Sequence, residues 1–535
     1  MNKMAALARN QEIAAYYDAL PYQSFCFPQS APEHLEAIAL LFGLNPPSSA
    51  KARVLELGCA GGGNLLPFAE RNPQARALGV DISAVHIAQA NATLGKMQIR
   101  NVRFEQKDLS QLGASLGTFD YIICHGVYSW VPEDVQHAIL DIAGKCLAED
   151  GVAYISYNTY PGWKTREIIR DAMRFRGGNR QPEDRLRFAR GMIEFMHKVA
   201  KPHSTLKATL DEIKPLIDQA APYYLFHDYL EPCNSPVYFT DFAAAAQRNS
   251  LAYLADTSLP TMFASNFGAA IAEPLLREVS GSQIMLEQYL DFITNRPFRQ
   301  TLLVPRQKAA GIKYRLDADR LASFHYAGFF EPETGRRQPG DPPGRAYFRS
   351  LTGSLHITGT AGNTLAKLFN NAWPSPLDFA QLLDALAKQT KSAPDQCRKT
   401  VSAFVEEGII KGYLRFRRSP LKCATTIPAK PRVSDALRNV LLKTTVSEPI
   451  SVWNGWHEAV TLSPFEVIIA RRLDGRTAIP ETAGDIEALA ANPAKACDDE
   501  RQAIELFLQS SGNLTTAIRQ TLEKLLRSGL ITAHR

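Results

Sequence analysis

The sequence predicts an α/β protein whose first third forms a doubly wound, parallel sheet. Short apolar runs alternate with amphipathic segments between residues 54 and 158. The first run breaks into a cluster of glycines before a helical segment, and the second run ends in an acid about 20 residues later. Strands that alternate with helices pair in parallel through right-handed crossovers. The carboxyl ends of these strands are therefore expected at one edge of the sheet.

The first predicted strand and its glycine turn give the strongest local signal. Residues 54–57 are apolar apart from Glu56, residues 58–63 are small (GCAGGG), and residues 64–71 have the spacing of an amphipathic helix. Glycine permits a tight turn and the close approach of a ligand, where a Cβ atom would clash. A strand, a glycine turn and a helix in this order form the first unit of a nucleotide-binding sheet.

The second predicted strand, residues 77–83, contains Asp81 near its end. A carboxylate at this distance from the glycines suits a hydrogen bond to a ribose. Asp81 could instead cap the following helix, a position that aspartate also favours. We prefer the ribose role, because the strand, the loop and the spacing all agree with it.

Three further strands follow, at residues 102–109, 119–126 and 151–158, with helical spacing over residues 82–94 and 132–147. Asp108, His125 and Tyr157 stand near the ends of these strands. Ligands of such sheets bind beyond the carboxyl ends of the strands. We therefore expect these three side chains to meet Gly58 and Asp81 around one site.

The pattern Glu-x-Gly-x-Ala-x-Gly at residues 56–62, together with Asp81, Asp108 and the strand from Phe119, forms a characteristic set. This set resembles the class I, Rossmann-like S-adenosylmethionine-dependent methyltransferases, which have a seven-stranded sheet. Ala60 stands where that family usually has glycine, a small change that leaves room for a ligand. The resemblance implies S-adenosylmethionine as the cofactor and assigns its binding to Glu56, Gly58, Cys59, Ala60, Gly62, Asn64, Asp81, Ile82, Asp108, Leu109 and His125.

Three local motifs are similar to a bacterial subgroup of these enzymes: residues 17–22 (YDALPY), 124–132 (CHGVYSWVP) and 156–164 (SYNTYPGWK). Members of this subgroup carry a methyltransferase regulatory domain and form dimers. Some are protein-lysine methyltransferases that act on an outer-membrane protein. The resemblance therefore implies a protein substrate, with an outer-membrane or surface protein precursor as the candidate, and a homodimer.

An aromatic cluster follows the fourth and fifth strands, and we assign the acceptor site to it: Tyr128, Trp130, Tyr157, Asn158 and Trp163. Methyl transfer from a sulfonium needs the acceptor within about 3–3.5 Å of the methyl group. A lysine acceptor, with a pKa of about 10.4, must also lose a proton, and burial between aromatic walls makes this easier. We hypothesise that Tyr157 or Asn158 holds the acceptor nitrogen. The alternative for each aromatic residue is ordinary core packing.

The start of the chain is rich in aromatic residues. We expect residues 11–32 to form a helix followed by extended segments at residues 20–22 and 27–29, with Tyr16, Tyr17, Tyr22, Phe25 and Phe27 close together. Two interpretations remain open at this point: a helix that packs on the edge of the sheet, or a flap that covers the cofactor.

Residues 184–220 show two helical patterns that form an insertion on the sheet. Residues 223–305 resemble the regulatory domain, yet a helix at 240–249 and strands at 251–255 and 300–304 also suit the last helix and hairpin of the sheet. We prefer the second interpretation, because it completes seven strands without a separate core. The expected division is 1–175 for the methyltransferase core, 176–222 for the helical insertion and candidate dimerisation element, and 223–305 for the regulatory domain or sheet end.

Residues 306–344 are expected to be a linker, since residues 331–346 hold the densest proline and glycine in the chain. A weak repeat follows, in which a helix ends on a glycine, Gly408 or Gly529, and leads into an apolar strand. It predicts two winged-helix-like α+β modules, residues 345–445 and 446–535.

A run of basic residues crosses the boundary between these modules and includes Arg415, Arg417, Arg418, Lys422 and Lys430. Such a run beside a winged helix could bind nucleic acid. A solvated surface is the commoner explanation of a charge run, and we do not expect a nucleic-acid partner. Winged helices also serve as protein-docking modules.

Composition limits the remaining choices. At 535 residues the chain is long enough for several domains, and its formal charge of +6 is mild. The first 20 residues lack an uninterrupted apolar core, no stretch reaches the length of a membrane span, and the eight cysteines, from Cys26 to Cys497, form no Cys-x-x-Cys pair. We expect a cytoplasmic protein without a metal site.

The resemblance implies methylation of protein lysine side chains, and we expect the C-terminal modules to recruit the substrate. Two alternatives remain. The first is a small-molecule O- or N-methyltransferase whose modules only pack or dimerise. The second is a regulator that binds the cofactor or nucleic acid without catalysis.

Overall fold

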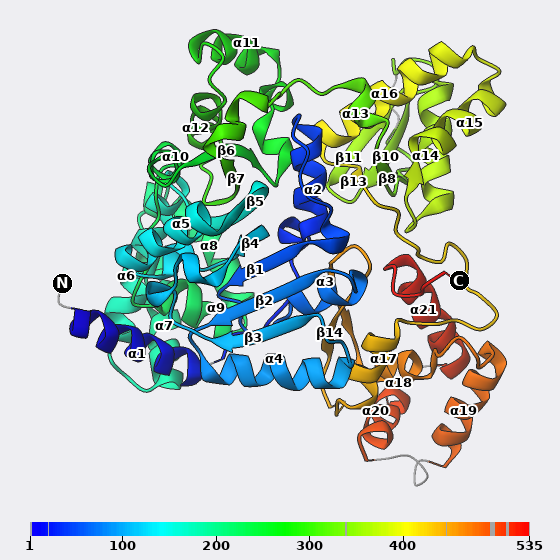
Figure 1. The fold of residues 1–535 in the computed structure, drawn as a ribbon. Coiled ribbons are helices and arrows are strands. Elements are labelled where there is room, and N and C mark those ends of the chain that lie inside the picture. The colour runs from blue at the N-terminus through cyan, green and yellow to red at the C-terminus, as the bar shows by residue number, and fades with distance from the viewer. Residues whose placement is uncertain are drawn as a thin grey trace.

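The computed structural model describes residues 3–19, 21–336, 340–445, 447–492, 498–509 and 513–533. Its centre is a seven-stranded sheet with the order β3-β2-β1-β4-β5-β7-β6 (Figure 1). The strands are β1 Arg53–Leu57, β2 Arg76–Asp81, β3 Val102–Gln106, β4 Phe119–Cys124, β5 Leu147–Asn158, β6 Leu251–Asp256 and β7 Phe298–Pro305. Strands β1 to β5 pair in parallel, whereas β7 is antiparallel to both β5 and β6. The predicted α/β class and the seven strands are confirmed.

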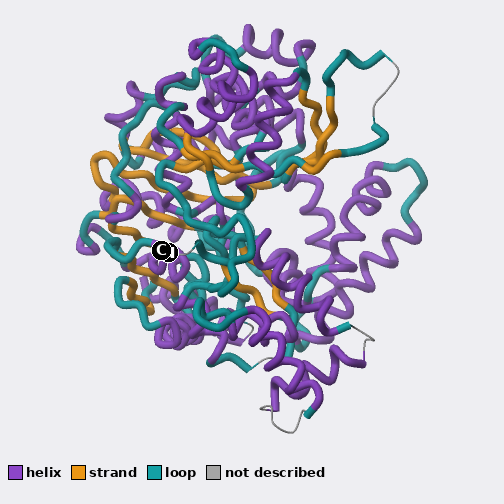
Figure 2. Tube along the Cα trace, turned by 90° about the vertical axis from the view of Figure 1, so that its right-hand side faces the viewer, coloured by secondary structure: helices purple, strands orange, loops and turns teal. Residues whose placement is uncertain are grey.

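Helices cover both faces of this sheet. They are α2 Pro32–Leu41, α3 Leu65–Arg71 and α4 Ala84–Met97 on one face, and α5 Glu133–Cys146 and α10 Phe239–Arg248 on the other. Successive strand residues face opposite sides, so Val54 packs in the first core and Leu55 in the second. Seen from the side, the strands (orange) form a band with helices (purple) on either side (Figure 2).

The N-terminal segment differs from the prediction. Helix α1 covers Lys3–Ala19, and residues 21–27 belong to no helix or strand. A 3-10 turn, Pro28–Ser30, replaces the extended segment predicted at residues 27–29. Helix α2, which was not predicted, follows this turn. Eight of its ten residues are buried. Two of the eight are Glu33 and Glu36, so the buried positions of this helix do not form an apolar stripe in the sequence.

The insertion contains α6 Gly162–Gly177, α7 Pro182–Val199, α8 Thr205–Gln219 and α9 Pro222–Leu225, followed by a π-helical turn, Phe226–Leu230. The two predicted helical patterns are confirmed as α7 and α8. These helices share a small core that includes Met173, Ile193 and Leu210. Several large apolar side chains point outward from α6, α7 and α8: Ile168, Phe175, Phe195, Val199 and Leu216.

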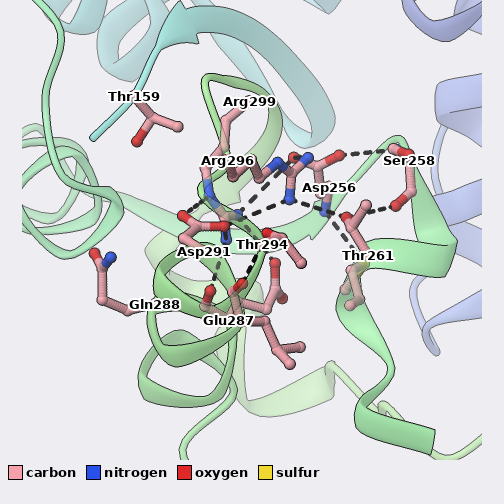
Figure 3. A network of polar contacts seen from close by, with 12 residues as sticks. Thr159, Asp256, Ser258, Thr261, Glu287, Gln288, Asp291, Thr294, Arg296 and Arg299 are labelled. Carbon is pink, nitrogen blue, oxygen red and sulfur yellow. Dashed lines mark hydrogen bonds and ion pairs between the residues drawn. The ribbon is translucent and has the colours of Figure 1, made fainter. Parts of the chain in front are cut away.

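Helices α11 Ala269–Glu278 and α12 Gln283–Thr294 form a helical excursion between β6 and β7. A buried ionic network joins α12 to the two strands (Figure 3). The Arg299 guanidinium, with 0% exposure, donates to the Asp291 carboxylate at 2.7 and 2.8 Å and to Glu287 Oε2 at 3.0 Å. Arg296 forms an ion pair with Asp256 at 2.8 Å. Residues 239–305 thus complete the sheet, as we preferred.

The first C-terminal module contains α13 Ala318–Leu321, β8 His325–Ala327, β9 Glu331–Pro332, β10 Ala346–Ser350, β11 Gly353–Ile357, α14 Thr360–Ala372, β12 Leu377–Asp378, α15 Phe379–Thr390, α16 Pro394–Lys411 and β13 Arg415–Arg417. One three-stranded sheet has the order β12-β8-β13 and another the order β11-β10-β9. Strands β8 and β9 lie inside the expected linker, residues 306–344, so the linker prediction was wrong for this part, which belongs to the module.

The second module contains α17 Asp435–Leu442, β14 Ile450–Trp453, β15 Ala459–Leu462, α18 Pro464–Arg472, α19 Ile479–Ala491, α20 Asp498–Gln509 and α21 Leu514–Arg527. Gly529, with φ +73°, follows α21 in the left-handed conformation as predicted. The prediction was wrong for Gly408, which lies inside α16 against Leu414; the left-handed residue there is Gly412, with φ +77°. The winged-helix arrangement of the modules stays a prediction.

The basic run serves contacts within the chain. Arg417 is 8% exposed, and Arg415 packs its guanidinium over the rings of Trp373 and Trp456 at 4.9 and 5.5 Å. Arg418 forms an ion pair with Glu36 of α2 at 3.1 Å. The expectation of a solvated surface was therefore wrong for Arg417 and for Arg415, whose side chain is 24% exposed. Arg418 keeps 46% of its side chain exposed, as expected, although it pairs with Glu36.

Among the helices of the described ranges, none is long and apolar enough to cross a membrane. The seven cysteines in these ranges are free thiols, and Cys497 lies outside them.

Candidate active site

A cavity of about 440 Å³ lies beyond the carboxyl ends of β1 to β5. Ten of the eleven residues predicted to bind the cofactor line it: Glu56, Gly58, Cys59, Ala60, Asn64, Asp81, Ile82, Asp108, Leu109 and His125. Of the predicted acceptor residues, Trp130, Asn158 and Trp163 also line it. The structure thus brings together side chains from five strands at the edge where the sequence places them.

The turn after β1 depends on small residues. Gly58 has φ +76° and Ala60 has φ +44°, both in the left-handed region. A Cβ atom on Gly58 would lie 2.4 Å from Val127 Cγ2, which would require the loop after β4 to move. Gly62 does not line the cavity; a Cβ atom there would lie 2.6 Å from Phe104 Cζ. Gly62 therefore lies where the turn packs against the Phe104 ring of β3.

Asp81 holds the turn in place from the end of β2. Its carboxylate accepts hydrogen bonds from the backbone N–H groups of Ala60 and Ser83, both at 2.9 Å. The N-cap of α4 is Ser83, whose hydroxyl oxygen accepts from the His86 N–H at 3.1 Å. The alternative in which Asp81 caps the helix is therefore wrong, and Asp81 remains at the cavity wall.

Glu56 is the most unusual group in the cavity. It is 3% exposed, and its Oε1 atom accepts from Asn64 Nδ2 at 2.9 Å. Its Oε2 atom has no hydrogen-bond partner among the described residues. Burial raises the pKa of Glu56 to about 8, the Asn64 bond opposes this rise, and the Asp81 charge adds to it. A cationic ligand group next to Oε2 would complete this site.

Helix α1 reaches the far end of the cavity. Asp108 Oδ1 accepts from the Ser110 N–H at 2.9 Å, and Asp108 Oδ2 accepts from Asn10 Nδ2 of α1 at 3.0 Å. Asn10 lines the same cavity. The N-terminal helix is thereby tied to the end of β3.

The end of α1 and the segment after it cover the cavity. Tyr17 of α1 lines it, as do Tyr22, Phe25 and Phe27 of the segment that follows. The Tyr22 N–H lies 3.0 Å from His86 Nε2, and Ser24 Oγ accepts from the Gly63 N–H at 2.8 Å. These contacts support a flap rather than packing on the sheet edge. The side chain of Tyr16 lies outside the described part of the chain.

His125 stands between the flap and β5. Its Nδ1 atom is 2.7 Å from the Tyr154 hydroxyl, and its ring centroid is 3.9 Å from that of Phe27. Burial lowers the pKa of His125 to about 4, so the ring is neutral at pH 7. A neutral ring at this position can shape the cavity without placing a charge in it.

Tyr128 and Tyr157 lie outside the cavity. Tyr157 is 1% exposed, stacks on Phe242 of α10 and shares a 3.1 Å hydrogen bond with Thr301 Oγ1. Tyr128 contacts the same Phe242 edge to face. Successive residues of β5 face opposite sides, so Asn158 meets the cavity where Tyr157 cannot. Asn158 Nδ2 in turn donates to Asn234 Oδ1 at 2.8 Å.

Trp130 and Trp163 face each other in the cavity wall, edge to face with centroids 6.0 Å apart. Two residues that the sequence did not predict, His227 and Asp228 of the π-helical turn, also line the cavity. Burial raises the pKa of Asp228 to about 6, although the Tyr224 hydroxyl hydrogen-bonds to this carboxylate.

The π-helical turn is a tertiary feature with no periodic signal in the sequence. Such turns occur frequently at functional sites. The only sequence signal for these residues was that two titratable side chains, His227 and Asp228, are adjacent in the segment that resembles the regulatory domain.

Comparisons with known proteins agree with this geometry. A family model described as a methyltransferase domain matches residues 54–151, and one described as a predicted methyltransferase regulatory domain matches residues 221–305. Protein RP789 of Rickettsia prowazekii is 30% identical over 526 residues, which cover 96% of this chain and 93% of that protein. The chain belongs to the S-adenosylmethionine-dependent methyltransferases that carry a regulatory domain.

Two further relatives extend the comparison to structure and sequence. The structure of PKMT2 from Rickettsia typhi in complex with AdoHcy has a TM-score of 0.82 and 30% identity, and the match covers 96% of this methyltransferase and 100% of that chain. Protein RP028 of R. prowazekii is 40% identical over 234 residues, or 43% of this chain and 94% of that protein. The likeness to PKMT2 thus includes both C-terminal modules.

The cofactor of this methyltransferase is S-adenosylmethionine. The residues present fit this group: Glu56 offers a buried carboxylate oxygen that lacks a partner in the described structure, as the cofactor's methionine ammonium requires. Asp81 and Asp108 offer carboxylates at the ends of the next two strands. His125, Trp130 and Trp163 line the same cavity.

Proposed function

We propose that this methyltransferase transfers methyl groups to lysine side chains of a protein. The observation that carries the proposal is the lining of the cavity, which combines the aromatic rings of Trp130, Trp163 and Tyr22 with the Asp228 carboxyl group. Aromatic faces and a carboxylate together suit an alkylammonium ion. The full-length likeness to PKMT2, whose name denotes a protein-lysine methyltransferase, supports the same acceptor.

In this proposal the cofactor residues divide into three groups. Glu56 binds the methionine ammonium, Asp81 the ribose hydroxyls, and Asp108 with Leu109 and Ile82 the adenine end. The turn residues Gly58, Cys59 and Ala60 provide backbone next to the cofactor, and His125 packs beside it.

The bound cofactor supplies a methyl group on a sulfonium, and the chain must deliver a neutral amine to it. We assign Asp228 as the group that accepts the proton of the lysine ammonium. The amine lone pair then forms the new N–C bond as the C–S bond breaks, and S-adenosylhomocysteine leaves. A carboxyl group with a pKa of about 6 is ionised at pH 7 and is a better proton acceptor than a solvated aspartate.

Water exclusion contributes to the same step. At pH 7 a lysine of pKa about 10.4 must pay roughly 4–5 kcal/mol to lose its proton in water. The rings of Tyr22, Trp130 and Trp163 lower this cost, since an apolar wall disfavours the charged form. The flap after α1 closes the cavity on the cofactor side.

The experiment uses a cofactor with a tritiated methyl group and lysate from the source cells. Label in protein, found on lysine by mass spectrometry, is the expected result. Label in small metabolites alone would favour a small-molecule acceptor and overturn the proposal. A protein that binds S-adenosylhomocysteine yet labels nothing would be a regulator. Asp241→Asn, an exposed change on α10, serves as the active control.

We further propose a cytoplasmic homodimer whose C-terminal modules recruit the protein substrate, an outer-membrane or surface protein precursor. The dimer is supported by the exposed apolar side chains of the insertion, among which Phe175 is 86% and Phe195 58% exposed. Sedimentation of the wild type as a dimer and of Phe175→Ser/Phe195→Ser as a monomer is expected. A monomeric wild type would refute the dimer.

A further inference from the structure

We infer that the second C-terminal module forms part of the cofactor site, with His457 as a positioning residue that orients Asn64 and, through it, Glu56. The inference rests on the proposed role of Glu56 in binding the methionine ammonium. It gives the module a function in addition to substrate recruitment, because residues more than 390 positions apart share one hydrogen-bond chain.

His457 lies in the turn between β14 and β15 and is 1% exposed. Its Nε2 atom is 2.7 Å from Asn64 Oδ1, and its Nδ1 atom is 2.7 Å from Arg71 Nη2. A guanidinium can only donate, so Nδ1 accepts and the Nε2–H group donates to Asn64. Burial and the Arg71 charge lower the pKa of His457 to about 3, which keeps this neutral form at pH 7.

The bond from His457 is the shortest of three that orient the Asn64 amide. Asn64 Oδ1 accepts from His457 Nε2–H at 2.7 Å, from the Ser30 hydroxyl at 3.1 Å and from the Phe27 N–H at 3.2 Å, so Nδ2 faces Glu56 Oε1 at 2.9 Å. An inverted amide would point its oxygen at a carboxylate and its N–H₂ group at two N–H donors. The orientation seen occupies Oε1 and leaves Oε2 to the cofactor.

The turn that carries His457 is held by its own hydrogen bonds. Asn454 Oδ1 accepts from the N–H groups of Trp456 and Glu458, both at 2.9 Å. His457 has φ +62°, a left-handed conformation that histidine and asparagine tolerate better than most residues. Trp453 of the same hairpin donates a hydrogen bond from Nε1 to Glu70 Oε2 at 2.5 Å, which joins the hairpin to α3. The hairpin therefore presents His457 to the cofactor turn as a rigid unit.

The test measures S-adenosylhomocysteine binding to the full chain by calorimetry. His457→Asn keeps an acceptor near Arg71 and suits the backbone, but its shorter side chain cannot reach Asn64. We expect its Kd to rise about tenfold, as for the loss of one buried hydrogen bond. His457→Gln can reach Asn64 with an N–H donor and should restore the Kd to within about twofold. His137→Asn, at an exposed site on α5, should leave the Kd unchanged.

A double-mutant cycle tests the path through Asn64. In an Asn64→Ala background the acceptor is gone, so His457→Asn should add no further loss. In turnover assays the cofactor KM should rise in His457→Asn while the acceptor KM stays the same. A His457→Asn protein that melts cooperatively and binds as the wild type does would overturn the inference. Weak binding by His457→Gln in a folded protein would do the same.

The outcome is separable from failure of the proposed function. If Glu56→Gln weakens binding and His457→Asn does not, only this inference fails. If neither variant changes the Kd, the placement of the ammonium at Glu56 is itself wrong. Because neither binding result concerns the methyl acceptor, the labelling experiment tests protein methylation independently.

Discussion

Tyr157 and Phe242 stack with their ring centroids 4.0 Å apart, on the face of the sheet that α5 and α10 cover. The contact places the Tyr157 hydroxyl against Thr301 in the core instead of in the cavity. An aromatic residue of the SYNTYPGWK motif is thus a packing residue.

Tyr157→Phe should therefore retain full turnover. It loses one buried hydrogen bond and should lower the free energy of unfolding by about 1 kcal/mol in urea titrations. Trp130→Ala, which removes a cavity wall in the neighbouring loop, should lower kcat/KM for the protein acceptor about tenfold. Equal losses of activity in both variants would contradict the core placement of Tyr157.

Asp228→Asn should lower kcat about 100-fold or more, the usual contribution of a positioned proton acceptor, with an unchanged Kd for S-adenosylhomocysteine. In the wild type, kcat/KM for the acceptor should fall tenfold per pH unit below about pH 6, since Asp228 must be ionised. This fall of kcat/KM at low pH should be absent in Asp228→Asn. If the variant shows the same fall as the wild type, another group accepts the proton.

Glu56 should make cofactor binding depend on pH. Its pKa in the folded protein, about 8, lies above that of a free glutamate, so ionisation of this group opposes folding as the pH rises from about 4.5 through 8. A bound ammonium favours the ionised form. Binding of S-adenosylhomocysteine should therefore weaken, with a rising Kd, as the pH falls from 8 to 6.

Glu56→Gln should remove this dependence and weaken binding at pH 8 about 10- to 100-fold. Glu133→Gln, on the surface of α5 with 88% of its side chain exposed, is the matched control. A pH dependence of the same slope in Glu56→Gln would show that another group titrates.

The Arg299 network should be a large source of stability for the end of the sheet. Although burial opposes its charge, the carboxylates of Glu287 and Asp291 hold the pKa of Arg299 well above its usual value. Arg299→Met leaves these carboxylates buried without their partner and should lower the free energy of unfolding by about 3–5 kcal/mol. Arg349→Met, which removes an exposed ion pair with Glu333, should have no measurable effect on urea unfolding. Similar urea midpoints of unfolding for Arg299→Met and Arg349→Met would contradict this account.

Local sequence patterns were sufficient for the sheet and the cofactor edge. The alternation of apolar runs with helices, the glycines after β1 and the acids at Asp81 and Asp108 all act within a few residues of the chain. Their predicted positions agree with the strand ends to within a few residues. The same alternation, applied strictly to β5, could have separated Tyr157 from Asn158.

Other parts of the site depend on contacts between distant segments. Asp228 reaches the cavity through a π-helical turn. His457 reaches Asn64 at the cavity wall through a hairpin that docks on α3. Neither position has a periodic signal. The same is true of Arg415 and Arg417, whose charges suggested an exposed surface but are enclosed by Trp373, Trp456 and Glu33.

The contact between Asn64 and His457 also constrains how the protein is made. A ribosome synthesises the chain from its N-terminus, so the sheet and the glycine turn emerge long before the hairpin that carries His457. During this interval the Asn64 amide lacks one of its donors. A chain that terminates before residue 457 has every strand of the sheet, yet it lacks the last hydrogen bond that orients the turn.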